Sequence, residues 1–242
     1  MSSPLSQEAV LRLLLNPQSI EAEKRRRRSA FVTLFPDTGP FRRELYQKHL
    51  EFFSAGALYK ERLFMAANRV GKTMAGAWET TCHLTGLYPP WWRGYRFDRP
   101  PDGWACGTNS QTTRDVVQAV LLGRSIGQGI IPAEAIVETV AGRGITGSIE
   151  TVWVRHASGG KSKLGFKTYE QGRRAFEGEA KDFVYCDEEP PGDVYVEILY
   201  RLLTTRGIVY TTFTPLLGRS EVVTSFVEPE NEGAGSKYVV QA

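Results

Sequence analysis

Two short stretches of this 242-residue sequence place reactive side chains directly after apolar runs. The first reads AANRVGKT and occupies residues 66–73, between the apolar run RLFM and a helix-forming segment. A loop that joins a strand to a helix presents backbone N–H groups and the positive end of the helix dipole, and both suit phosphate oxygens. Gly71 permits the tight backbone path, Lys72 supplies a compact positive charge for the β and γ phosphates, and the Thr73 hydroxyl can ligate Mg²⁺. The expected nucleotide contacts are Ala67, Asn68, Arg69, Val70, Gly71, Lys72 and Thr73.

The loop departs from the common phosphate-binding pattern at two positions. Ala66 stands where that pattern has its first glycine, and Arg69 lies inside the loop. Ala66 is tolerable because the backbone turn is set mainly by Gly71. Arg69 adds a second positive charge within reach of a γ-phosphate, so we expect Arg69 and Lys72 to stabilise the transition state of phosphoryl transfer. The alternative interpretation is an ordinary turn between a strand and a helix, with an exposed lysine.

The second reactive stretch is FVYCDEE at residues 183–189, an apolar strand that ends in acids. A carboxylate at the end of a strand can hold Mg²⁺, and the next one can orient and deprotonate a water molecule. We assign the metal role to Asp187 and the general-base role to Glu188. Glu189 is the weaker candidate for the base, because Pro190 follows it and turns the chain away.

Two further stretches carry weaker signals. Residues 211–215 read TTFTP, and the threonine hydroxyls at the end of this strand, Thr214 among them, could sense the γ-phosphate through water or Glu188. A strand that merely favours threonine is the alternative. Upstream of the phosphate loop, ELYQKHL places Gln47 beside an aromatic residue. A glutamine there could read the edge of an adenine.

Strand-forming and helix-forming segments alternate from about residue 46 onward. This alternation predicts a mostly parallel, three-layer α/β sheet with ligands beyond the carboxyl ends of the strands. Together with the phosphate loop it indicates a P-loop NTPase of the RecA/ASCE-like class. The expected strands are 62–67, 103–108, 182–189 and 208–215, the expected helices are 71–84, 111–122 and 193–203, and segments 151–156 and 163–169 predict an added β-hairpin.

The chain divides into three expected parts: an N-terminal helical arm over residues 1–45, an ATPase core over 46–228 and the start of a linker over 229–242. The arm contains a basic run, Lys24 to Arg28. Successive helical residues turn by about 100°, so this run would surround the helix axis rather than line one face. It predicts a solvated helix, with a contact to a phosphate backbone or an acidic partner as the alternative.

Composition excludes several classes of protein. The three cysteines form no C-x-x-C pair and the three histidines form no ligand-spaced cluster, so a disulfide framework or a zinc site is not expected. No apolar run approaches the roughly 18 residues that cross a membrane, which predicts a soluble, intracellular protein without a membrane partner. The net charge of +3 does not by itself indicate nucleic-acid binding.

The order of motifs LYQ, AANRVGKT, WACGTNSQTTRD, FVYCDEE and TTFTP resembles the ATPase domain of the phage large terminase, over residues 41–228. This resemblance implies an ATP-hydrolysing, Mg²⁺-dependent motor that drives double-stranded viral DNA into a procapsid. A helicase of the same superfamily and a non-hydrolysing nucleotide-binding assembly module are the alternatives. A helicase that works as a monomer needs a second motor-like domain, and the sequence contains none.

The resemblance also implies roles for individual residues. Ala66 and Arg69 match deviations that are common in the family's phosphate loop, and Thr214 matches the motif that couples hydrolysis to movement. Family motors form rings in which an arginine of a neighbour completes the site. We favour Arg174 for this role, while Arg173, Arg201 and Arg206 remain candidates. The resemblance also implies that Lys72 binds phosphate and that Thr73 binds magnesium. It implies a metal role for Asp187, a base role for Glu188 and an adenine contact for Gln47.

Partners and surroundings follow from the resemblance as well. It implies double-stranded DNA, a portal protein and a small terminase subunit as partners, in the cytoplasm of the host cell and outside the mature virion. It implies a homo-oligomeric ring on the procapsid, with a monomer in isolation as the alternative. A C-terminal nuclease domain would follow the linker, so no DNA cleavage is expected from these residues. Two segments could grip DNA: the loop at 91–99, rich in arginine and aromatic residues, and the hairpin tip with Lys161 and Lys163. The alternatives are a Pro-stiffened loop that packs over the domain and a plain solvated turn.

Overall fold

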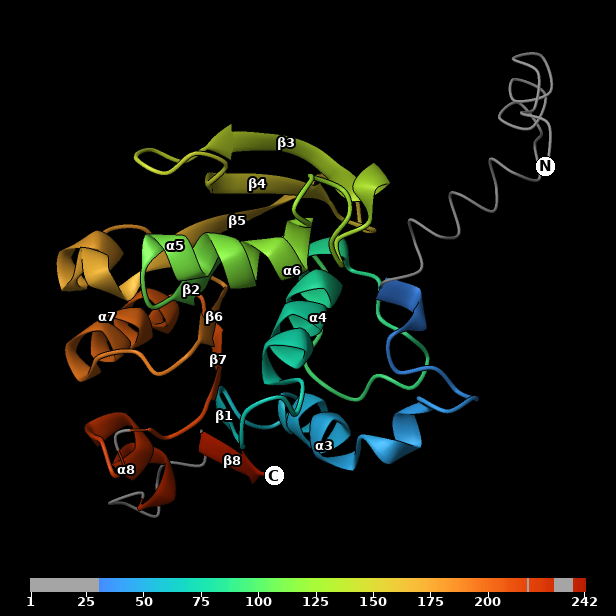
Figure 1. Ribbon diagram of the computed structural model, residues 1–242, viewed down its shortest axis with the longest axis horizontal. Helices are drawn as coiled ribbons and strands as arrows, with labels where there is room; N and C mark the ends of the chain where they lie inside the picture. The colour runs from blue at the N-terminus through green and yellow to red at the C-terminus, as the bar shows by residue number, and fades with distance from the viewer. Residues whose placement is uncertain (1–30, 217, 229–236) are drawn as a thin grey trace, which may run out of the picture.

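The computed structural model describes residues 31–216, 218–228 and 237–242, which build one eight-stranded sheet (Figure 1). The strand order is β3–β4–β5–β2–β6–β7–β1–β8. β4 runs antiparallel to both of its neighbours, and every other pair of neighbouring strands is parallel. The strands are β1 (Glu61–Met65), β2 (Asp102–Gly107), β3 (Ile136–Ala141), β4 (Ile149–Arg155), β5 (Lys161–Thr168), β6 (Phe183–Asp187), β7 (Ile208–Phe213) and β8 (Lys237–Gln241).

Helices cover both faces of the sheet, which confirms the predicted three-layer architecture. α3 and α4 lie on one side of the central strands, and α7 and α8 lie on the other (Figure 1). The first group is α3 (Gln47–Ala55), α4 (Lys72–Thr85), α5 (Ser110–Thr112), the π-helix η2 (Thr113–Gln118) and α6 (Ala119–Leu122). The second group is η4 (Tyr169–Gln171), η5 (Arg173–Phe176), α7 (Gly192–Leu203) and α8 (Glu221–Val227). Two short 3-10 turns, η1 (Arg43–Leu45) and η3 (Ala133–Ala135), lie in connections.

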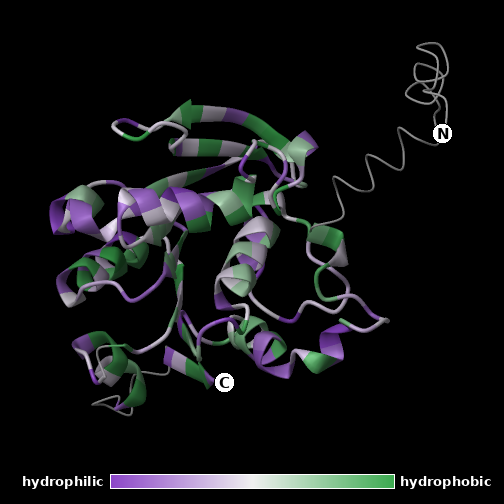
Figure 2. Ribbon diagram, viewed as in Figure 1, coloured by the Kyte–Doolittle hydropathy of each residue, from purple (hydrophilic) through white to green (hydrophobic). Residues whose placement is uncertain are grey.

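Alternation along the strands divides the interior into two cores, one under each helical layer. Side chains of neighbouring residues point to opposite faces of a strand. On β1, Phe64 therefore packs toward α3 and α4, whereas Leu63 packs toward α7 and α8. On β6, Tyr185 and Cys186 divide in the same way. Figure 2 shows hydrophobic residues along these central strands, whereas the region of α5 is mostly hydrophilic.

The strand order brings the reactive stretches to one edge of the sheet. β7 lies between the strand of the phosphate loop, β1, and the acidic strand, β6. All three are parallel, so their carboxyl ends meet at the same edge. The register aligns Asp187 with Thr212 and Thr212 with Phe64. This edge is where an open α/β sheet binds its ligand.

The structure differs from the expected chain organisation near the C-terminus. Residues 237–241 form β8, which pairs in parallel with β1 over five residues, so the ATPase sheet extends beyond residue 228. Val240 is fully buried, because the apolar run YVV completes the sheet beside α3. The predicted β-hairpin is likewise part of the main sheet, through the parallel pairing of β5 with β2.

Most of the predicted helical arm, including the basic run from Lys24 to Arg28, lies outside the described residues. Residues 31–33 are helical, and Phe31 stacks on Trp78 of α4 at a ring-centroid distance of 5.6 Å. Within the described ranges, no helix combines the length and the apolar character needed to span a bilayer.

The aromatic loop at 91–99 packs onto the domain instead of projecting from it. The ring of Trp91 lies parallel to that of Trp78, at 5.4 Å and 6°, and Trp92 is 1% exposed. Arg99 forms a bidentate ion pair with Asp182. The loop therefore closes the core above α4, and its tryptophans are engaged in packing rather than free to grip DNA.

Candidate nucleotide-binding site

The phosphate loop spans the gap between Met65, the last residue of β1, and Lys72, the first residue of α4. Gly71 has φ +85°, as the sequence predicts for the residue that sets the turn. Arg69 is also left-handed, with φ +66°, although this conformation costs an L-residue about 1–2 kcal/mol. Backbone strain of this kind is concentrated at functional sites. The Arg69 side chain is exposed and forms no hydrogen bond or ion pair with the described residues.

The N-terminus of α4 has the geometry to bind an anion. The first N–H groups of a helix have no partner within the helix, and no side chain caps this helix at Gly71. With 14 residues, α4 is long enough to develop the full positive end of the helix dipole. Phosphate oxygens are therefore the matching ligand for the segment from Val70 to Thr73.

Lys72 lies beneath the loop and is 8% exposed. Its Nζ donates to the carbonyls of Ala66 at 2.9 Å and Ala67 at 2.7 Å, and to the Thr214 hydroxyl at 2.9 Å. Burial lowers the pKa of Lys72, and the charges of Glu188 and Asp187 oppose that shift. The Lys72 ammonium is thus hydrogen-bonded to the phosphate loop and to Thr214, and the charges of Glu188 and Asp187 act on it.

Thr214 is tied to the loop through a second contact. Its hydroxyl lies 2.9 Å from the Ala66 carbonyl and 2.9 Å from Oδ1 of Asn68, and its single hydrogen can serve either acceptor. The structure thus brings Thr214, Asn68 and Lys72 together, as the sequence predicts.

Asp187 ends β6 and is 5% exposed. Its Oδ1 accepts hydrogen bonds from the Tyr185 hydroxyl at 2.8 Å and the Thr212 hydroxyl at 3.1 Å. Burial raises the pKa of Asp187, and hydrogen bonds from Tyr185, Thr73 and Thr212, together with the charge of Lys72, oppose that shift. The Asp187 carboxylate and the Thr73 hydroxyl together provide oxygen ligands that suit a hard cation such as Mg²⁺. Over the described ranges, no cluster of three His, Cys, Asp or Glu residues could hold a metal.

Glu188 is exposed and left-handed, with φ +64°. Its N–H donates to the Thr212 carbonyl at 3.0 Å, and its carbonyl accepts from the Tyr169 hydroxyl at 3.1 Å. Partial burial and the charge of Asp187 raise the pKa of Glu188, which strengthens it as a base, while Lys72 opposes the shift. Glu189 instead accepts a short hydrogen bond from Ser220, the residue that caps α8.

Sequence reasoning missed His49, which lies under the phosphate loop. A Cβ added at Gly71 would meet Nε2 of His49 at 3.3 Å. Burial lowers the pKa of His49, and contacts with the backbone of Gly71 and Val70 oppose that shift. Gln47, by contrast, is exposed at the start of α3 and makes no side-chain hydrogen bond with the described residues. The signal that could have found His49 is its helical spacing from Phe52 and Phe53, which places all three on the buried face.

The four candidate arginines lie in different environments. Arg201 and Arg206 precede β7 and lie at the amino edge of the sheet, away from the nucleotide loop; Arg201 is also paired with Glu197 at 2.9 Å. Arg173 and Arg174 come after the carboxyl end of β5, in η5, which packs against α7. Arg173 pairs with Glu197 at 3.1 Å, whereas Arg174 is exposed and has no such partner among the described residues.

Fold and site together define a P-loop nucleoside triphosphatase of the class in which an extra strand separates the phosphate-loop strand from the acidic strand. The family model described as "Terminase large subunit, T4likevirus-type, N-terminal" matches residues 63–240. The chain therefore belongs to the phage large terminase family and corresponds to its N-terminal ATPase domain.

Individual relatives agree with this assignment. The large terminase subunit of Salmonella phage P22 is 37% identical, in a match that covers 76% of this chain and 41% of that protein. The chain thus spans less than half the length of this curated relative.

Solved structures of low sequence identity support the fold. The large terminase ATPase domain of Thermus phage P74-26 matches with a TM-score of 0.59 at 16% identity, over 88% of this chain and 83% of that one. The large terminase of another thermophilic bacteriophage, solved in complex with ADP, matches with a TM-score of 0.53 at 10% identity, over 89% of this chain and 44% of that one.

We expect Asp187→Asn to stabilise the fold at neutral pH by a few degrees Celsius in Tm. The folded-state pKa of Asp187 lies above its unfolded value, so its contribution to stability is present at low pH and is lost as pH rises through the folded pKa. The gain in Tm should therefore be seen at pH 7 to 8 and shrink as the pH falls through the folded-state pKa, below which the Asp187 carboxyl is protonated and neutral like asparagine. Thermal melts without nucleotide or metal measure it, with Asp193→Asn, an exposed acid of α7, as the control. An Asp187→Asn protein that melts below the parent at pH 8 would contradict it.

Proposed function

We propose that this domain is an ATP-hydrolysing motor that drives the translocation of double-stranded DNA into a procapsid. The observation that supports it most directly is the convergence of Lys72, Asp187, Glu188 and Thr214 at one edge of the sheet. A phosphate loop alone would serve a nucleotide-binding scaffold equally well. A buried acid followed by an exposed acid of raised pKa favours hydrolysis.

The reaction is ATP plus water to ADP and phosphate. The loop N–H groups and Lys72 bind the phosphates, and Thr73 and Asp187 would hold Mg²⁺, which neutralises phosphate charge when it is bound. Glu188 orients the attacking water and removes its proton. Thr214 reports the state of the phosphate site, because its hydroxyl touches both Lys72 and Asn68.

Completion of the site by a neighbouring subunit is the part of this proposal that the geometry makes testable. Arg174 is exposed and free of the Glu197 carboxylate that holds both Arg173 and Arg201. We therefore propose that Arg174 of one subunit stabilises transition-state charge in the next. Such arginines contribute factors of about 10³–10⁵ in related phosphoryl-transfer sites.

A mixing experiment tests this arrangement. Arg174→Ala and Glu188→Gln should each be inactive alone, but in a mixed ring one subunit supplies the glutamate and its neighbour the arginine. We expect part of the ATPase activity to return on mixing and to rise with protein concentration. Arg206→Ala, at the opposite edge, is the control and should behave as the parent. Full activity of Arg174→Ala alone would exclude it as the trans residue.

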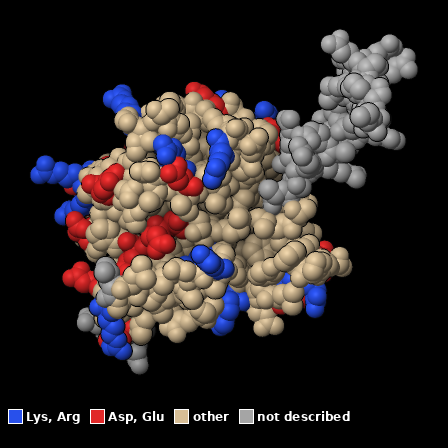
Figure 3. Space-filling view, in the orientation of Figure 1, with Lys and Arg blue, Asp and Glu red and all other residues tan. Residues whose placement is uncertain are grey.

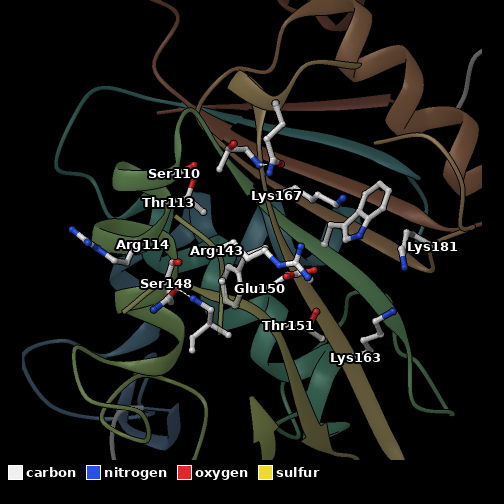
Figure 4. A pocket seen from close by; sticks show the side chains of 18 of the residues that line it. Ser110, Thr113, Arg114, Arg143, Ser148, Glu150, Thr151, Lys163, Lys167 and Lys181 are labelled. Carbon is white, nitrogen blue, oxygen red and sulfur yellow. Dashed lines mark hydrogen bonds between the residues drawn. The ribbon is translucent and has the colours of Figure 1, made fainter. Parts of the chain in front are cut away.

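DNA contact requires phosphate recognition without sequence preference. Figure 3 shows positive and negative side chains interspersed on the visible face, so charge alone does not mark a DNA surface on that face. A groove of about 690 Å³ beside β4 and β5 gathers several cationic side chains (Figure 4). At one end of it Lys163 is already paired with Glu179 at 3.4 Å, and Lys181 with Asp102 at 2.9 Å. Lys161, at the tip of the β4–β5 turn, is exposed and remains the freer candidate for a phosphate contact.

The remaining parts of the proposal follow from family membership. A portal protein and a small terminase subunit are the expected partners, the assembled form is a ring, and the host cytoplasm is the place of action. A nuclease domain following this ATPase is also a proposal. Measuring ATPase activity with and without duplex DNA separates the motor from a scaffold, and a strand-separation assay separates it from a helicase.

A further inference from the structure

Tyr169 lies directly behind the proposed general base. It is the first residue of η4 and is 6% exposed. Its hydroxyl is 3.1 Å from the carbonyl oxygen of Glu188 and 3.3 Å from that of Asp187. Burial raises the pKa of Tyr169 well above its ordinary value, so the hydroxyl keeps its proton and acts as a donor.

The backbone of Glu188 needs such a contact. Its φ of +64° is costly for a residue with a Cβ, and such a conformation persists only where the surroundings enforce it. The N–H of Glu188 is bound to Thr212 on β7, and its carbonyl is bound to Tyr169. These two bonds hold both ends of the strained residue, and the backbone orientation decides where the carboxylate points.

Tyr169 is itself held from several sides. The N–H of Glu170 donates to the Thr108 carbonyl at 3.1 Å, and the Glu170 carboxylate accepts from the N–H and the hydroxyl of Ser110 at 2.7 and 2.6 Å. The Tyr169 ring lies in the same core as Phe176 and Cys186. η4 is therefore fastened to the end of β2 and the start of α5, and Tyr169 reaches Glu188 from a fixed position.

We propose that Tyr169 is a positioning residue for the hydrolysis reaction, which holds the Glu188 backbone in the left-handed conformation that directs the carboxylate to the attacking water. This inference rests on the proposed function. It predicts that the loss of the Tyr169 hydroxyl affects the chemical step and leaves nucleotide binding unchanged, because the phosphate loop lies on other elements. A misplaced catalytic group typically costs one to two orders of magnitude in rate.

The test is Tyr169→Phe, which removes the hydroxyl and keeps the ring. We expect kcat for ATP to fall about tenfold or more while KM and the Kd for ATP change less than about twofold. Tyr195→Phe is the matched control: Tyr195 is buried on the same face of the sheet and donates to Glu61 at 2.8 Å, away from the site.

Comparing Tyr169→Phe with Glu188→Gln distinguishes a failure of the positioning role from a failure of the proposed ATPase function. If Glu188→Gln is inactive while Tyr169→Phe keeps the kcat of the parent, the positioning role is wrong and the proposed function stands. If Glu188→Gln retains activity, the assignment of the base fails first. If Tyr169→Phe and Tyr195→Phe lose kcat and Tm equally, the hydroxyl has only a structural role and the inference is overturned.

Discussion

Replacing Glu188 with glutamine is expected to lower kcat for ATP hydrolysis by a factor of about 10³ while ATP binding remains intact. Glutamine preserves the length of the side chain but cannot accept a proton from water. The contacts that bind the phosphates belong to the loop at 66–73 and to the N-terminus of α4, and neither involves the Glu188 side chain. The binding constant should therefore stay within a few-fold of the parent value.

Phosphate release and equilibrium ATP binding, measured on the same preparation, decide this prediction. Glu189→Gln is the matched control, because it is the adjacent acid and its carboxylate is engaged by Ser220 instead of facing the site. We expect Glu189→Gln to retain most of the activity. If Glu189→Gln were the inactive variant and Glu188→Gln the active one, the two acids would have to exchange roles.

The convergence of the candidate site residues at one edge of the sheet was predictable because their signals are local. A glycine that must turn, a lysine and threonine that open a helix, and acids that end an apolar strand each reveal themselves within a few residues. The parallel arrangement of strands then forces Lys72 and Asp187 to one edge. Thr214 could be placed for the same reason, since it follows the strand between them.

The supporting contacts could not be predicted, because they join residues that are distant along the chain. Tyr169 contacts Glu188, which is 19 positions further along the chain. His49 lies against the phosphate loop at Gly71, although β1 stands between the two in the sequence. A tyrosine or histidine in a short segment carries no sign of its partner. Gln47 was singled out because its chemistry suits adenine, but the face of α3 that packs inward carries His49.

β8 was missed for a related reason. The segment KYVVQ follows a polar, Gly-rich stretch, which is typical of a linker between domains. Pairing with β1 determines its role, and a strand's partner is set by the tertiary fold rather than by its own sequence.

A buried ion pair connects the phosphate-loop strand to the phosphate-loop helix, and it too was invisible in the sequence. Arg62 of β1 and Glu79 of α4 are both fully buried, and two guanidinium nitrogens contact the carboxylate at 2.6 and 3.1 Å. Burial alone would raise the pKa of Glu79, but the charge of Arg62 and hydrogen bonds from His83 and Arg62 outweigh it and lower that pKa. His83 links the pair to Tyr88 and so to the aromatic loop.

Replacing Arg62 with alanine is expected to destabilise the domain by about 3–5 kcal/mol, because it leaves the Glu79 carboxylate buried without its counter-charge. The same change also removes the hydrogen bond to the Phe52 carbonyl at 2.8 Å. In a domain of this size we expect Tm to fall by about 6–20 °C, measured by thermal or urea unfolding.

A second substitution shows whether the isolated charge causes that loss. In Arg62→Met with Glu79→Gln, methionine fills much of the arginine volume and glutamine retains an acceptor for His83 without a charge. We expect this double variant to recover a large part of the lost stability relative to Arg62→Met alone, which gives a favourable coupling in the double-mutant cycle. If the two substitutions were simply additive, Arg62 would act through packing and its bond to Phe52, and the ion pair would contribute nothing of its own. If ATP affinity falls in Arg62→Met and returns in the double variant, the unpaired charge of Glu79 is what disturbs the phosphate loop, because both variants lack the ion pair.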